Sequence, residues 1–233
     1  MSAELLDSIS DWMMYVMQAS ILIPMAVVWR RRRHFSPTVG LLSWYVYLSL
    51  GCVLALQLYP RYLPSNHGVL VAFNAGKIAL FGAVYHRVLW GRGRQVVAVA
   101  TGAALVVILA AVAYNLSAAV AIARVVQCAV LVGFALVYLE QRLGRSSARP
   151  AASDPLWLLS VGQLLYSAGT VAAFSFTAKL QETRHGGNMK FMFVSVSGLV
   201  FNYFLTLAFL RARSGPAHQP APAAAPASQL AGR

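Results

Sequence analysis

Seven long stretches of apolar residues follow one another along the chain, and short segments, several of them rich in arginine, separate them. Each stretch has about the 20 residues that a helix needs to cross a ~30 Å hydrocarbon core. A backbone in lipid must satisfy its hydrogen bonds internally, so we predict an all-α, polytopic integral membrane protein with seven transmembrane helices. The predicted spans are Ile9–Trp29, Thr38–Tyr59, Val69–Trp90, Gln95–Tyr114, Ala118–Tyr138, Leu156–Thr177 and Met189–Leu210.

The two ends of the chain differ from the spans. Residues 214–233 combine four prolines with many alanines, and such a segment buries too little apolar surface to offset the cost of ordering. We therefore predict a bundle over residues 1–213 and a disordered Pro/Ala-rich cytoplasmic tail over 214–233. We predict that the first span is not a cleavable signal peptide, because acids (Glu4, Asp7, Asp11) lie before it and at its start and no basic segment precedes it.

Composition narrows the class further. Hydrophobic residues make up 59% of the chain and charged residues 11%, against about 25% charged in soluble domains. This excludes an ordinary cytosolic enzyme and a disordered protein. Cys52 and Cys128 are too few for a disulfide framework and lie inside apolar stretches, where we expect small buried side chains. The net charge of +13 lies mostly between the spans, so we predict no nucleic-acid binding.

Basic residues predict the orientation. With the N-terminus outside, the inner side holds thirteen arginines: Arg30, Arg31, Arg32, Arg33, Arg87, Arg92, Arg94, Arg142, Arg145, Arg149, Arg211, Arg213 and Arg233. The outer side holds four basic residues: Arg61, Lys179, Arg184 and Lys190. The positive-inside rule therefore predicts an N-out, C-in protein, which we expect in a bacterial cytoplasmic membrane.

The spans also indicate a parallel 3+1+3 repeat. The first span aligns with the fifth and the second with the sixth, pairing Gln18 with Gln127, Pro24 with Gly133, Trp29 with Tyr138, and Ser49, Gly51 and Val53 with Ser167, Gly169 and Val171. The fourth span, almost wholly aliphatic, would be either lipid-exposed or a topological spacer. The alternative is a chance alignment of two apolar helices. Pro24 is expected to kink the first span, and five glycines to allow close helix packing: Gly76, Gly82, Gly162, Gly169 and Gly198.

This plan resembles the seven-helix transporters of the PQ-loop and SWEET-like families, which also run N-out, C-in. The resemblance concerns architecture and implies a carrier of small solutes. The Pro-Gln dipeptide of those families is absent from the spans. The chain also resembles small uncharacterised bacterial seven-helix proteins around Phe73-Asn74, Tyr85 and Asn202-Tyr203.

Polar residues within the spans predict the site. An ionisable residue inside the bilayer is costly and by default marks function. Lys77 lies ~12 Å below the outer end of the third span at 1.5 Å per residue, and Arg124 lies in the outer half of the fifth. We predict an outward-facing polar cavity that binds a ligand through Lys77, Asn74, Arg124, Gln127, Gln18, Gln57, Gln163 and Asn202.

Several alternatives stay open. Lys77 could be uncharged, and Arg124 could extend to the outer interface. Asp7 and Asp11, at the mouth of the first span, are the nearest carboxylates that could pair with either cation. His86, near the inner end of the third span, is either an interfacial residue or part of a proton relay.

The chain lacks the motifs of intramembrane enzymes. Its histidines are scattered, no HExxH or Gly-x-Ser-x-Gly motif occurs, and no histidine is placed to complete a site with Cys128. A microbial rhodopsin would need a lysine in the middle of the seventh span, whereas Lys190 lies at its mouth. We predict neither catalysis nor a metal or cofactor.

Two functions remain. The first is a transporter or binding bundle for a small polar or anionic solute, with alternating access between the two three-helix units. The second is a non-catalytic membrane sensor or scaffold subunit that binds a lipid or a protein. The predicted partners are the lipid bilayer, the solute, and anionic lipid at Arg30, Arg31, Arg32 and Arg33. Assembly into a homo-oligomer is left open.

Overall fold

The computed structural model describes residues 3–58, 65–144, 153–180 and 186–212, and each element in these ranges is helical. The helices are α1 (Ala3–Ser20), α2 (Leu22–Arg31), η1 (Arg32–His34), α3 (Pro37–Leu58), α4 (His67–Val88), α5 (Gly91–Tyr114), α6 (Leu116–Leu143), α7 (Pro155–Leu180) and α8 (Gly186–Arg211). Seven helical segments are long and apolar enough to span a membrane, α1 and α2 together forming the first. The predicted seven-helix architecture is confirmed. The predicted tail lies outside the described residues.

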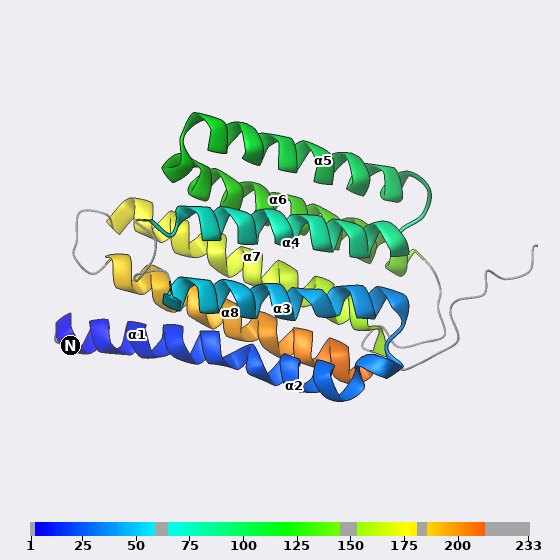
Figure 1. Cartoon of the computed structure of the whole chain (residues 1–233), viewed down its shortest axis with the longest axis horizontal. Helices are drawn as coiled ribbons and strands as arrows, with labels where there is room; N and C mark the ends of the chain where they lie inside the picture. The colour runs from blue at the N-terminus through cyan, green and yellow to red at the C-terminus, as the bar shows by residue number, and fades with distance from the viewer. Residues whose placement is uncertain (1–2, 59–64, 145–152, 181–185, 213–233) are drawn as a thin grey trace, which may run out of the picture.

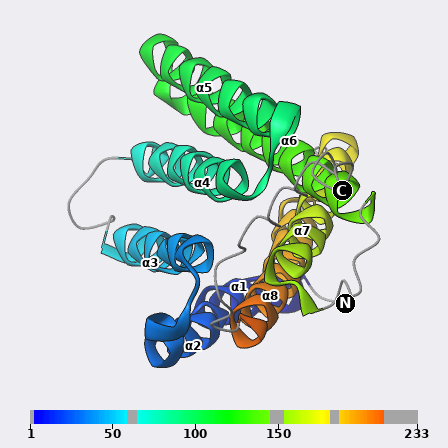
Figure 2. The ribbon, with the colours of Figure 1, turned by 90° about the vertical axis from the view of Figure 1, so that its right-hand side faces the viewer.

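The helices surround one interior, and α5 stands outside it. Figures 1 and 2 show the other helices arranged around a shared core, in the order α1 with α2, α3, α4, α6, α7 and α8. Helix α5 packs on the outside, against α4 and α6. Much of α5 is exposed, including Val99, Val106 and Leu109. This peripheral position agrees with the prediction that the fourth span stands apart.

Local sequence explains where the helices begin. The Asn115 side chain accepts hydrogen bonds from the backbone N–H groups of Ser117 and Ala118, at 2.8 and 3.2 Å, and so caps α6. Pro37 and Pro155 are the first residues of α3 and α7, where a missing N–H costs nothing. Gly91 has a φ of +56°, which favours glycine and permits the tight turn from α4 into α5.

The α-helical pattern of the first span is interrupted before Pro24, where a kink is predicted, although Ile21 keeps helical backbone angles (φ −65°, ψ −21°). α1 ends at Ser20 and α2 begins at Leu22, so the interruption falls at Ile21. A proline has no N–H and its ring clashes with the carbonyl four residues earlier, which here belongs to Ser20. The Ser20 hydroxyl donates instead to the carbonyl of Met17 at 2.6 Å and accepts a hydrogen bond from Asn202 Nδ2 at 2.7 Å.

Close packing on α7 and α8 depends on glycine. A Cβ atom at Gly162 would collide with Phe204, and one at Gly169 would collide with Ser197. Two of the other predicted glycines likewise face close neighbours: Gly82 faces Thr101, and Gly198 faces Met17. Gly76 lies against Leu48 with slightly more room. The predicted role of these five glycines in close packing is therefore confirmed.

Candidate functional site

Lys77 lies at the centre of the helix bundle, with only 1% of its surface exposed. Its Nζ faces four aromatic rings, with ring centroids 5.4 Å away for Tyr45, 5.7 Å for Phe81, 4.4 Å for Tyr166 and 4.8 Å for Phe201. All four lie within the ~6 Å over which a ring attracts a cation. We call these four residues the aromatic cage.

The aromatic cage is assembled from four different helices, α3, α4, α7 and α8. Phe81 is one helical turn after Lys77 on α4, which places both side chains on one face. Tyr45 contacts Phe81 and Phe201 edge-on, with centroids 5.4 and 5.6 Å apart, and Tyr166 lies 5.7 Å from Phe201. These ring contacts hold the cage together around the ammonium group.

Among the described side chains, no carboxylate pairs with Lys77. Asp11 and Glu140 are exposed, and Asp154 pairs with Arg142 at 3.2 Å near the start of α7. The side chain of Asp7, the other predicted partner, lies outside the described residues. In the described part of the chain, rings rather than an acid thus surround the Lys77 amino group.

Polar side chains of α6 and α7 lie beside the aromatic cage. Cys128 is within electrostatic range of Lys77 and Arg124, and it neighbours Ser167. Tyr166 is within the same range of Cys128 and Arg124. The predicted cations on the third and fifth spans therefore belong to one neighbourhood inside the bundle. Arg124 itself is half-buried.

Two glutamine amides in this region have unused hydrogen-bonding atoms. Gln127 and Gln163 are 2% and 0% exposed. Gln163 Nε2 donates to Ser167 Oγ at 2.9 Å, but Gln163 Oε1 and Gln127 Nε2 have no partner in the described structure. Leaving such a group unsatisfied costs about 1–3 kcal/mol. One buried donor on α6 and one buried acceptor on α7 thus lack a hydrogen-bond partner among the described residues.

The other predicted ligand-binding residues have partners of their own. Asn74 is buried, and its Nδ2 donates to the Leu70 carbonyl at 2.8 Å. Gln57 Nε2 donates to Gln18 Oε1 at 3.3 Å, which links α3 to α1 at an exposed position. Asn202, as described above, binds Ser20. Gln18, Gln57 and Asn202 thus link neighbouring helices, whereas the Asn74 bond lies within α4. Whether these residues also contact a ligand stays a prediction.

His86 lies at the end of α4, half-buried. Its Nε2 accepts a hydrogen bond from Arg94 Nε at 3.1 Å. Its neighbour Tyr85 is fully buried and shares a hydrogen bond of 2.8 Å with Ser160. A proton relay through His86 stays a prediction.

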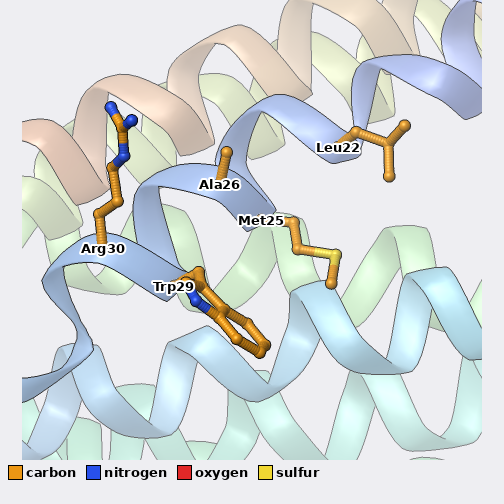
Figure 3. Close-up of a pocket in the computed structure, with 5 residues that line it drawn as sticks. All are labelled: Leu22, Met25, Ala26, Trp29 and Arg30. Carbon is orange, nitrogen blue, oxygen red and sulfur yellow. The ribbon is translucent and has the colours of Figure 1, made fainter.

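The predicted opening toward the outside differs from the observed surface. Lys77 is almost fully buried, so it lines no open cavity in this conformation. Two surface hollows lie instead along α2 and at its end. One is lined by Trp29, Arg32, Arg33 and Tyr47, and the other, shown in Figure 3, by Leu22, Met25, Ala26, Trp29 and Arg30.

The aromatic cage was not predicted from the sequence. The spacing between Lys77 and Phe81 places them on one helical face, which is a local sign of a ring beside the lysine. Tyr45, Tyr166 and Phe201 are ordinary aromatic residues of apolar spans, and only the packing of four helices brings them together.

No family model matches the chain, and neither does any curated protein or solved structure.

Proposed function

We propose that this membrane protein binds a small polar or anionic solute inside the helix bundle and carries it across the membrane. The observation that carries the proposal is that two buried amide atoms, Gln127 Nε2 and Gln163 Oε1, have no partner in the described structure. They belong to α6 and α7, the helices that also carry Arg124 and Tyr166, whose ring faces Lys77 Nζ at 4.4 Å. We assign the solute-binding site to the part of the bundle interior that contains Lys77, Gln127 and Gln163. The same proposal places the protein in a bacterial cytoplasmic membrane with its N-terminus outside.

The charge balance favours an anionic group on the solute. Removing an ammonium group from water costs several kcal/mol in a real protein. A desolvated cation–π contact returns about 2 kcal/mol or more, so the aromatic cage offsets part of that cost. An anion near Lys77 and Arg124 would offset more of it, while the two free amide atoms would orient the bound molecule.

The helix arrangement is compatible with alternating access. In our proposal the units that move are the helices before α5 and those after it, related as a parallel 3+1+3 repeat. Their position on either side of the interior, with α5 outside the ring, supports this division (Figure 2). The break at Ile21 gives the first unit a place to bend.

Ligand-dependent stability tests the proposal. The detergent-purified protein is heated with small anions, sugars and amino acids, alongside Lys77→Met, Gln127→Leu and the control Gln95→Leu, an exposed glutamine of the peripheral α5. A solute that binds only the folded state at a hundredfold excess over its Kd adds about 2.7 kcal/mol of stability. We expect this shift in the wild type and in Gln95→Leu, and its loss in the two site variants.

Two results would contradict the proposal. One is that no small solute raises the melting temperature. The other is that the shift survives in Lys77→Met and Gln127→Leu, both of which must elute as folded protein. Solutes that raise the melting temperature of the wild type but not of the two site variants are then tested for uptake into proteoliposomes.

A non-catalytic sensor or scaffold subunit is the second candidate, and the cluster Arg30–Arg33 at the end of α2 favours it. In that case, replacing the four arginines should reduce recovery of a partner more than Lys77→Met does.

A further inference from the structure

The four consecutive arginines at the end of α2 have different surroundings. Arg31 Nη1 donates to the carbonyl of Leu210 at 2.7 Å, near the end of α8. The guanidinium of Arg32 lies over the rings of Trp44 and Tyr47, 5.3 and 5.7 Å from their centroids. Arg31 thus ties two helices together, whereas Arg32 is held in place against α3.

A hollow at this end has the chemistry of a phosphate site. It is lined by Trp29, Arg32, Arg33 and Tyr47, which come from α2, η1 and α3. A guanidinium presents paired N–H donors that match a phosphate group. No described carboxylate lines this hollow. The rings of Trp44 and Tyr47 hold the Arg32 guanidinium in one orientation.

A second, largely apolar hollow continues from the first along α2. Leu22, Met25, Ala26 and Trp29 are spaced so that they share one side of the helix, and Arg30 lies at the end of the set (Figure 3). Trp29 lines both hollows. A basic site and an apolar groove therefore meet at a single tryptophan, 76% of whose surface is exposed.

We propose that these two hollows bind one anionic phospholipid of the surrounding bilayer. The phosphate of the headgroup lies against Arg32 and Arg33, and one acyl chain follows Leu22, Met25 and Ala26 toward the middle of the membrane. The tryptophan ring packs at the junction, where amphipathic rings are favoured. Because two guanidinium groups face one phosphate, a lipid with net negative charge binds in preference to a zwitterionic one. This site is separate from the proposed solute site at Lys77.

Lipid-dependent stability of the detergent-purified full chain tests this site. The probes are phosphatidylglycerol, phosphatidylcholine with the same acyl chains, and inorganic phosphate. The variant Arg32→Gln/Arg33→Gln is compared with Arg87→Gln/Arg92→Gln, which removes the same charge from exposed residues at the same end of the bundle. We expect phosphatidylglycerol to raise the melting temperature of the wild type and the control by several degrees. The site variant should lose more than half of that shift, and inorganic phosphate should produce little of it.

Three results would overturn the proposal. Equal loss in both double variants would mean that charge alone attracts the lipid. An equal shift with phosphatidylcholine would remove the role of the headgroup, and a full shift with inorganic phosphate would remove the role of the acyl chain. The single variants Arg32→Gln and Arg33→Gln repeat the comparison where the double variant fails to fold.

Discussion

The α7–α8 pair and the α2–α3 pair are both neighbouring helices joined by a short connection, yet they pack very differently. α7 and α8 contact each other more extensively than any other two described helices, whereas α2 and α3 meet over only a few residues. Glycine explains the first case, because Gly162 and Gly169 admit Phe204 and Ser197. On α3, Gly51 has open space around it.

We call the α7–α8 side, where the helices pack closely, the closed side of the bundle. We call the α2–α3 side, where few residues meet, the open side. Helices in lipid associate through close packing rather than through a hydrophobic driving force, so small residues decide where two backbones approach. The α7–α8 pair follows that rule. The α2–α3 pair does not, and two surface hollows lie along α2, which meets α3 over only a few residues. We expect lipid binding and bending to occur on this open side.

The largest effect is expected from Gly169→Val. Its added methyl groups would collide with Ser197, and overpacking of this kind costs about 1–3 kcal/mol. The matched control is Gly51→Val, at the position that the repeat alignment pairs with Gly169. It faces open space and should change stability by less than about 0.5 kcal/mol. The measurement is the free energy of unfolding in detergent micelles. Equal losses would contradict the distinction between a closed and an open side.

A medium effect is expected from Tyr85→Phe, which tests whether the closed side extends to α4. The Tyr85 hydroxyl and Ser160 Oγ are 2.8 Å apart and fully buried, so removing the hydroxyl should cost about 0.5–1.5 kcal/mol. Tyr47→Phe, on the open side, keeps the ring beneath Arg32 and should leave stability unchanged in lipid-free detergent. If Tyr85→Phe were as neutral as Tyr47→Phe, α4 would not be fastened to α7.

The sequence predicts the closed side better than the site. The number of spans and the packing glycines follow from local composition, because length, hydropathy and residue size act within one helix. Pro24 likewise predicts the interruption of the first span, because its missing N–H leaves the Ser20 carbonyl of the same span without a backbone donor. The surroundings of Lys77 cannot be derived in this way, because Tyr45, Tyr166 and Phe201 come from three other helices. For the same reason, the sequence does not show that Gln18 pairs with Gln57.

The smallest effect is expected from Ser20→Ala at the break in the first span. Asn202 Nδ2 donates to the Ser20 hydroxyl at 2.7 Å and so links α8 to the end of α1. Hydrogen bonds between transmembrane helices average about 0.6 kcal/mol, and Ser20→Ala should lose roughly that amount of unfolding free energy. Ser117→Ala, an exposed serine at the start of α6, is the control. A loss as large as that of Gly169→Val would mean that one polar contact, rather than packing, holds the first span to the bundle. In that event the open side would be fastened as firmly as the closed one, and the break at Ile21 would be a rigid corner instead of a place to bend.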